Sequence, residues 1–174
     1  VILLRSPGSM AAPFCDALEA AGIHCALDGS SSLMDTPEVS TFCALLQALS
    51  NPRLDIPLLS ILASPVFGFT ADDLASFRGD CKKGSIYDAM KQSQSEKVQY
   101  FLSVLDVLRK KSRMENLTQL LQSCLTLTRL DSIFGAMSGA EARQQNLQTF
   151  YQMAVDYESS SLRTLDQFLE YLQT

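Results

Sequence analysis

A nearly continuous series of helix-forming segments, from Thr36 to the end of the chain, is the feature that most limits the fold. The first segment contains EVSTFCALLQALS, where apolar residues recur every three or four positions, as on one face of a helix. We expect Thr36 to cap this helix, with Pro37 in its first turn and Glu38 placed to interact with the helix dipole. Asn51-Pro52 should end it, because a proline disfavours helical geometry in the preceding residue.

The same kind of pattern continues through the rest of the chain. Thr70 and Asp73 have the spacing of a capping box, so a helix is expected to begin there. A long helix with one apolar stripe is expected from about Glu96 to Lys111. The helices predicted after the first are DIPLLSILAS, TADDLASFR, SIYDAMKQ, Glu96 to Lys111, ENLTQLLQSCLTLT, GAEARQQNLQTFYQMAVDYESS and TLDQFLEYLQT. Residues 34–174 are therefore predicted to form a multi-helical domain.

Residues 1–33 follow a different pattern. They predict a strand from Val1 to Leu4, a turn at Ser6 to Ser9, a helix from about Met10 to Ala21, and a second strand in IHCALDG. Gly22 suits the C-terminal cap of the helix. A β-α-β unit implies a parallel sheet, and two strands alone do not make a sheet covered on both faces. We therefore expect the chain to begin inside a larger protein.

The composition narrows the class of protein. Hydrophobic residues make up 47% of the chain and charged residues 19%, which is typical of a globular domain. The net charge of -5 argues against a freestanding nucleic-acid-binding protein, because phosphate contacts usually need a basic surface. The dense basic run RKKSR, from Arg109 to Arg113, either touches a phosphate backbone or complements the C-terminal end of a helix. No apolar run is long enough for a membrane span, and no membrane partner is expected.

The sequence contains no recognisable catalytic motif. It has neither a Gly-x-x-x-x-Gly-Lys-Ser/Thr loop for a triphosphate nor a Gly-x-Ser-x-Gly elbow. The cysteines have no Cys-x-x-Cys pair and are expected to be reduced thiols, and with one histidine no zinc site is expected. A thiol enzyme using Cys15 or Cys25 is disfavoured because His24 and Cys25 would point to opposite faces of a strand. Asp72 and Asp73 fit the role of helix-dipole partners better than that of metal ligands.

One ordered series of segments resembles a known family. VILLRSPGSMAAPFCDALEAAGIHCALDG, followed by SSLMDTPEVSTFCALLQALSNPRLDIPLLSILASPVFGFTADDL, resembles the UvrD/Rep group of superfamily-one DNA helicases, especially the AddA (RexA) helicase-nuclease subunits. The likeness covers Val1 to Leu74 closely, and the later helices are similar in order and size. It implies that residues 1–33 are the β-α-β edge of the second RecA-like motor domain, 2A. Residues 34–174 would be most of the helical domain 2B.

The resemblance also implies a function for the parent protein. The parent would be an ATP-dependent DNA helicase of the helicase-nuclease type, acting in DNA unwinding and in double-strand-break repair and recombination. It would use ATP and Mg²⁺, whereas this fragment would hold no cofactor and be inactive alone. Its partners would be single-stranded DNA, duplex junctions and a nuclease or helicase subunit, in the bacterial cytoplasm. The alternative is an independent α-helical module that binds a protein partner.

Two groups of residues are candidate DNA contacts by this resemblance. In the family a strand-end arginine helps to hold single-stranded DNA, which would make Arg5, with Ser6 beside it, a phosphate contact. A guanidinium at the C-terminal end of a parallel strand suits that role. The other interpretation is that Arg5 pairs with a carboxylate. UvrD-type enzymes have an asparagine two places after the arginine, where this chain has Pro7, so that second contact is in doubt.

The second candidate is the turn formed by Gly68, Phe69 and Thr70. It lies where UvrD-type 2B domains carry a Gly-Ile-Gly turn, whose backbone amides meet duplex phosphates. Here Phe67 replaces the preceding basic residue, Thr70 replaces the second glycine, and the two aspartates that follow would repel phosphate. The turn is therefore either a duplex contact or a packing element, and the sequence favours packing.

Overall fold

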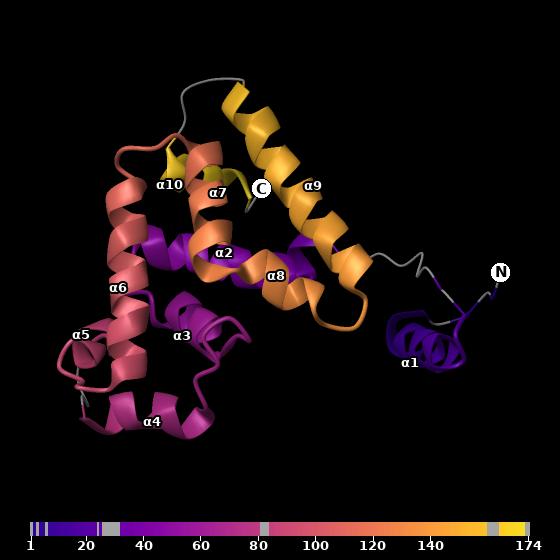
Figure 1. Ribbon diagram of the computed structural model, residues 1–174, viewed down its shortest axis with the longest axis horizontal. Coiled ribbons are helices and arrows are strands. Elements are labelled where there is room, and N and C mark those ends of the chain that lie inside the picture. The colour runs from indigo at the N-terminus through magenta and orange to yellow at the C-terminus, as the bar shows by residue number, and fades with distance from the viewer. Residues whose placement is uncertain are drawn as a thin grey trace. The chain divides into compact units, whose positions relative to one another are not determined.

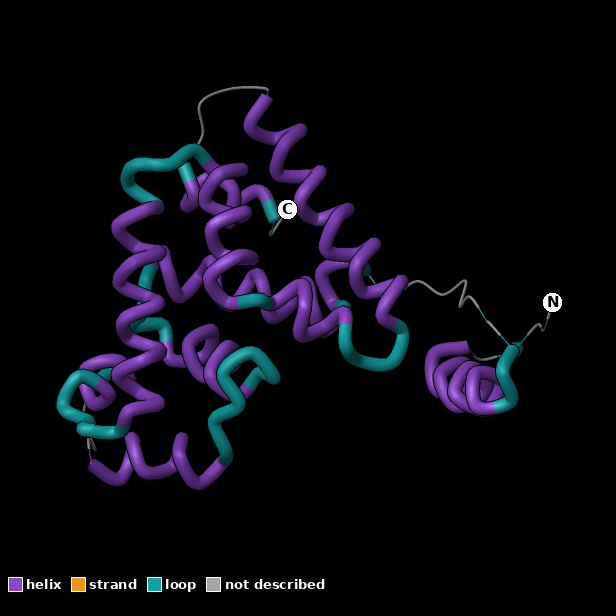
Figure 2. Tube along the Cα trace, in the orientation of Figure 1, coloured by secondary structure: helices purple, strands orange, loops and turns teal. Residues whose placement is uncertain are grey.

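A computed structural model describes residues 2, 4, 5, 7–23, 25, 32–80, 84–159 and 164–172. The chain divides into two compact units, Val1–Ser32 and Leu33–Thr174. Within the described residues the structure contains ten α-helices and one short 3₁₀ helix, and these residues form no β-strand (Figure 2). The mainly helical character predicted from the sequence is confirmed.

The first unit contains helix α1, Pro7–Ala20. The turn predicted at Ser6 to Ser9 is wrong for its last three residues, which are helical, because a proline with its fixed φ is well suited to the first position of a helix. At the other end Gly22 has a φ of 75°, and the N–H of Ile23 donates to the carbonyl of Leu18 at 2.9 Å. The capping role predicted for Gly22 is confirmed, since this is the Schellman arrangement.

The two strands of the predicted β-α-β unit are not shown. Ile2 and Leu4 in the first, and Ile23 and Cys25 in the second, are not in strands. The remaining residues of both predicted strands lie outside the described residues, so the β-α-β unit stays a prediction.

The second unit is built from nine of the α-helices, preceded by the short helix η1 (Figure 1). All the helices predicted after residue 33 are present. One more, Leu130–Gly135, follows Arg129, whose φ of 53° turns the chain sharply after the preceding helix. The elements are η1 Leu33–Asp35, α2 Pro37–Ser50, α3 Asp55–Ala63, α4 Ala71–Asp80, α5 Ile86–Met90, α6 Glu96–Lys111, α7 Leu117–Thr128, α8 Leu130–Gly135, α9 Ala140–Ser159 and α10 Leu165–Tyr171.

Helix α2 is the centre of this unit, since α3, α6, α8, α9 and α10 all pack against it. Its apolar stripe supplies much of the core, and Val39, Phe42 and Leu46 have no exposed surface. Aromatic rings extend this core across three helices: Phe42 lies 5.4 Å from Phe150 of α9, which lies 5.9 Å from Phe168 of α10, measured between ring centroids. Distant parts of the sequence are therefore held around one helix.

A buried ion pair ties the start of α2 to α9. The Glu38 carboxylate accepts hydrogen bonds from Nη1 of Arg143 and Nδ2 of Asn146, both at 2.7 Å. Only 1% of Glu38 is exposed, and Arg143 also lies over the ring of Phe134 on α8, 5.8 Å from its centroid. The sequence predicted only an interaction of Glu38 with the helix dipole. The main contacts of its carboxylate come instead from residues more than 100 positions away.

A second carboxylate joins α9 to α7. Glu158, near the end of α9, accepts hydrogen bonds from the backbone N–H groups of Leu117 at 2.9 Å and Thr118 at 3.3 Å. Asn116 and Gln119 form a capping box at the same helix start. The first N–H groups of α7, which have no partners within a helix, are thus satisfied by side chains of this unit.

Candidate nucleic-acid interface

Arg5 lies in the first unit, in a bend immediately before α1. Its side chain is exposed, which leaves the guanidinium accessible to an anion. Pro7 is the first residue of α1, so the position that carries an asparagine in UvrD-type enzymes begins the helix here. Ser6 lies outside the described residues. The DNA-binding role of Arg5 and Ser6 stays a prediction.

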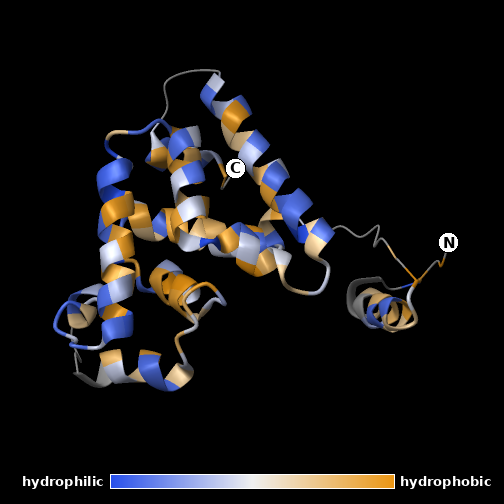
Figure 3. Cartoon of the chain, in the orientation of Figure 1, coloured by the Kyte–Doolittle hydropathy of each residue, from blue (hydrophilic) through white to orange (hydrophobic). Residues whose placement is uncertain are grey.

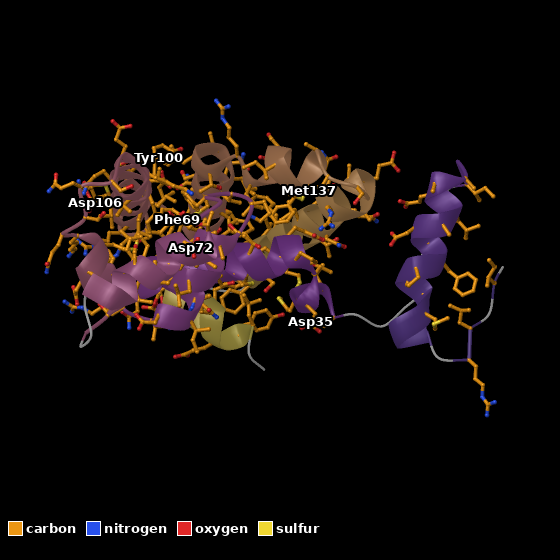
Figure 4. All side chains as sticks on the ribbon, turned by 90° about the horizontal axis from the view of Figure 1, so that it is seen from below. Asp35, Phe69, Asp72, Tyr100, Asp106 and Met137 are labelled. Atoms are coloured by element: carbon orange, nitrogen blue, oxygen red, sulfur yellow. A yellow bond between two sulfur atoms is a disulfide. The ribbon has the colours of Figure 1, made fainter. Side chains whose placement is uncertain are left out.

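The turn after α3 is anchored by its aromatic residue. Phe69 is 5% exposed, and its ring lies 6.1 Å from that of Phe77 on α4 and 6.5 Å from that of Phe101 on α6 (Figure 4). The backbone N–H of Phe69 donates to the carbonyl of Leu62 at 2.9 Å. Gly68 is exposed and has a φ of 60°, a conformation that glycine adopts without strain. Phe69 is thus part of the core.

A lysine that no sequence motif indicated completes this turn. Nζ of Lys97, on α6, donates to the carbonyl of Gly68 at 2.6 Å and lies 3.5 Å from Oδ2 of Asp73. The same ammonium lies 4.4 Å from the centroid of the Phe69 ring. Lys97 is 29 residues from Gly68 in sequence, so no local pattern points to it. This cation at the turn is already bound by groups of its own unit.

Thr70 and Asp73 form the predicted capping box. The N–H of Thr70 donates to Oδ2 of Asp73 at 2.9 Å, and the N–H of Asp73 donates to Oγ1 of Thr70 at 3.2 Å. The backbone hydrogen bond from Thr70 is the main reason that the pKa of Asp73 lies below its ordinary value, and Lys97 lowers this pKa further. Because carboxylates already occupy the start of α4, and Asp72 beside them is exposed (Figure 4), the geometry favours the packing interpretation of this turn. Its duplex-contact role is not tested.

The basic run at the end of α6 is mostly engaged within the unit. Nε of Arg109 donates to the carbonyl of Leu49, at the C-terminal end of α2, at 3.2 Å. Lys110 pairs with Asp106 at 2.8 Å, and Lys111 pairs with Glu115. Arg113 is exposed. These contacts support the interpretation of RKKSR as a helix end.

The described residues contain neither a phosphate-binding sequence motif nor a cluster of metal-ligating side chains. The chain has no phosphate-binding loop of the Gly-x-x-x-x-Gly-Lys-Ser/Thr type. Across the parts of the chain that the structure describes, no three His, Cys, Asp or Glu residues gather as metal ligands. The helices seen there include none long and apolar enough to cross a membrane.

The cysteines offer no activated nucleophile among the described residues. The structure joins Cys15 to Cys25 in a disulfide with Cα atoms 6.0 Å apart, so the expectation of reduced thiols is wrong for this pair. Burial raises the pKa of Cys43 to about 11 and that of Cys124 higher still. These two thiols are therefore protonated and weakly reactive near neutral pH. His24 lies outside the described residues.

Comparison with known proteins identifies the family. The model of the UvrD-like helicase C-terminal domain matches residues 1–173. The chain belongs to this family. The predicted resemblance to UvrD/Rep helicases and AddA subunits is thus confirmed.

Curated relatives of this UvrD-like domain are named as ATP-dependent helicase/nuclease subunits of the A type. The protein of this name from Acetivibrio thermocellus is 38% identical over 179 residues, those of Carboxydothermus hydrogenoformans and Oceanobacillus iheyensis are 34% and 35% identical, and each alignment covers 99% of the chain. The chain spans only 14% to 15% of the length of these relatives. It thus corresponds to a small part of each.

Proposed function

We propose that this chain is a segment of an ATP-dependent helicase/nuclease subunit that acts on DNA. The observation that carries the proposal is the match of 99% of the chain to relatives with that name. In this proposal the parent translocates on single-stranded DNA in the bacterial cytoplasm, using ATP and Mg²⁺ bound by residues outside this chain. It serves double-strand-break repair and recombination together with a nuclease or helicase partner subunit.

We assign the two parts of the chain different roles in that parent. Residues 1–33 are the β-α-β edge of motor domain 2A, and residues 34–174 are a 2B-like helical domain that braces or regulates the motor. The brace is supported by the core around α2 and by the buried pair of Glu38 and Arg143, which fix the helices to one another. A rigid body of this kind can limit how far a motor domain moves.

The division of labour is tested by ATP hydrolysis. The purified 174-residue chain should show no ATPase activity above a blank, while the full-length parent should hydrolyse ATP when single-stranded DNA is added. ATPase activity in the chain alone that is lost on mutation within it would contradict the proposal.

Glu38→Gln in the full-length parent tests the bracing role. If the 2B-like domain braces the motor, this substitution should change the number of ATP molecules hydrolysed per base pair unwound. If it destabilises the 2B-like domain but leaves that number unchanged, the bracing role is wrong.

The DNA contact of Arg5 is tested by the salt dependence of binding. Arg5→Ala in the full-length parent should weaken single-strand binding and lower the slope of log affinity against log salt by about one, because one phosphate contact is lost. Arg53→Ala removes another exposed arginine, which pairs with Asp88, and is the matched control. An unchanged slope for Arg5→Ala would remove the DNA role from this residue.

A further inference from the structure

An apolar cavity of about 310 Å³ opens between four elements of the second unit. Its size is at the lower end of the range for ligand pockets, and most of its lining is apolar. No charged side chain lines it, and Ser40, Gln47 and Ser60 are the polar residues of the lining. It can accept a bulky apolar side chain. We call it the α2–α3–α10 groove, lined by Met34, Ser40, Cys43, Ala44, Gln47, Ile56, Pro57, Ser60, Leu169 and Leu172.

Helix α3, which forms one wall of the groove, is apolar on nearly all sides (Figure 3). One side is in the core, where Leu58 and Ile61 have no exposed surface. On the groove side Ile56 is 84% exposed. A helix that is hydrophobic all round is normally buried all round. The groove side of α3 therefore has the composition of a covered surface.

The walls of the groove carry acidic charge alone. Neither lysine nor arginine occurs in η1, α2, α3 or α10. Asp35 follows Met34 and Glu170 follows Leu169, and both carboxylates are exposed (Figure 4 labels Asp35). Asp55, which precedes Ile56, accepts a hydrogen bond from the N–H of Ile86 at 2.9 Å instead. Such a surface repels phosphate and attracts cations.

We propose that the α2–α3–α10 groove binds a basic amphipathic segment of a partner protein. One bulky apolar side chain of that segment fills the cavity as an anchor, and lysines or arginines on either side face the exposed carboxylates of Asp35 and Glu170. The densest cationic run of this chain, RKKSR, is a poor candidate for that segment in a second copy, because three of its four cations are engaged in contacts within their own unit. This binding is a property of the second unit and goes beyond its bracing role.

The first test uses a synthetic peptide as the probe. An amphipathic helical peptide of about 14 residues, with leucines on one face and lysines on the other, is titrated into the 174-residue chain and followed by fluorescence anisotropy. A matched peptide with glutamate in place of lysine should bind at least about tenfold more weakly. In an Ile56→Cys variant, the lysine peptide should also slow maleimide labelling of the introduced thiol, which replaces an exposed residue of the groove, as measured by mass spectrometry. Equal binding of the two peptides, or no protection of that thiol, would overturn the proposal.

Two exposed apolar residues provide a matched pair of variants. Ile56 in the groove and Met114 outside it are 84% and 89% exposed, so replacing either with serine should leave the chain folded. Ile56→Ser should weaken binding of the lysine peptide by about tenfold, whereas Met114→Ser should not change it. Glu170→Lys should weaken it too, while Asp131→Lys, on α8, should have little effect. Equal losses at the groove and control positions would contradict the assigned site.

Two measurements decide between occupants. If the chain forms dimers that Ile56→Ser abolishes, a second copy occupies the groove and the proposal is wrong. If the thiol introduced by Ile56→Cys in the full-length parent is blocked to maleimide without any other protein, the parent's own polypeptide covers the groove and the proposal is also wrong. Free labelling of that thiol in the parent supports an external partner. Cys124, which is fully buried, serves as the unlabelled internal control.

Discussion

The two ends of α3 differ in how many contacts their residues make with the rest of the unit. After its C-terminal end, the turn from Phe67 to Thr70 has a buried aromatic anchor, and Lys97 and Asp73 bond its backbone. Near the N-terminal end, Ile56 is exposed at the rim of an apolar groove. The turn was a candidate duplex contact for which the sequence favoured packing, and its backbone is bonded within its own unit, while Ile56 at the groove stays exposed. Residue types at a turn therefore say less about binding than whether their contacts are already made.

The largest expected effect is the loss of stability when the buried aromatic ring after the C-terminal end of α3 is removed. Phe69→Ala should lower the free energy of unfolding by about 3 to 5 kcal/mol, because it removes a buried ring and leaves a cavity among Phe77 and Phe101. Urea unfolding of the 174-residue chain measures this. Ile56→Ala, at the other end of α3, should change it by less than about 0.5 kcal/mol. Similar losses for both variants would erase the difference between the two ends.

The second prediction compares a carboxylate that has its partner with one that lacks it. Glu38→Gln should destabilise the unit by about 3 kcal/mol, because the nearly fully buried carboxylate is lost and the half-buried Arg143 keeps a charge without its partner. Glu170→Gln, on the exposed rim of the groove, should change stability by less than about 0.5 kcal/mol. Urea unfolding of the two variants measures both effects, from the midpoint of each transition and from the slope of unfolding free energy against urea concentration. A small effect at Glu38 would mean that the pair does not hold α2 to α9.

The third prediction concerns the backbone of the turn. Gly68→Ala should destabilise by about 1 to 2 kcal/mol, since no side chain crowds the site and the φ of 60° alone is unfavourable for alanine. Gly68→Asn should lose less, because asparagine tolerates this conformation better. Thermal unfolding of the two variants gives the order. If both variants unfolded at the same temperature as the unsubstituted chain, the turn would not hold this conformation in solution.

The smallest expected effect is a change in acid stability at the same turn. The folded-state pKa of Asp73 lies below its unfolded value, chiefly through the hydrogen bond from the Thr70 N–H. Its contribution is therefore present above about pH 4, the unfolded value, and is lost as pH falls through the lower folded value. Asp73→Asn should flatten the acid limb of a stability-pH curve more than Asp72→Asn does. Identical curves for the two variants would exclude this linkage.

Local signals in the sequence were sufficient for much of the fold. Helix α6 runs from Glu96 to Lys111 as predicted, because its apolar stripe is regular, and the capping box of Thr70 and Asp73 is formed by neighbours in sequence. Helix α8 was missed because it depends on Arg129 adopting a positive φ, which its residue type does not indicate.

The sites were harder to predict because they depend on long-range packing. Lys97 reaches the turn from another helix, and no spacing rule connects it to Gly68. The α2–α3–α10 groove depends on which side of α3 the other helices leave uncovered. Periodicity shows that α3 is apolar but cannot show which part of it stays exposed. A turn at Gly68 is present as expected, and its contacts are set in part by Lys97 from another helix, while its duplex-contact role stays a prediction.

The contact between Glu158 and the start of α7 couples the C-terminal end of α9 to the N-terminal end of α7. One carboxylate binds the N–H groups of two successive residues, Leu117 and Thr118, so both lose their partner together if the end of α9 unwinds. Strain applied to the segment after residue 159 would therefore reach the connection between α6 and α7 directly. Hydrogen exchange at those two amides would report such movement before the core around α2 responds.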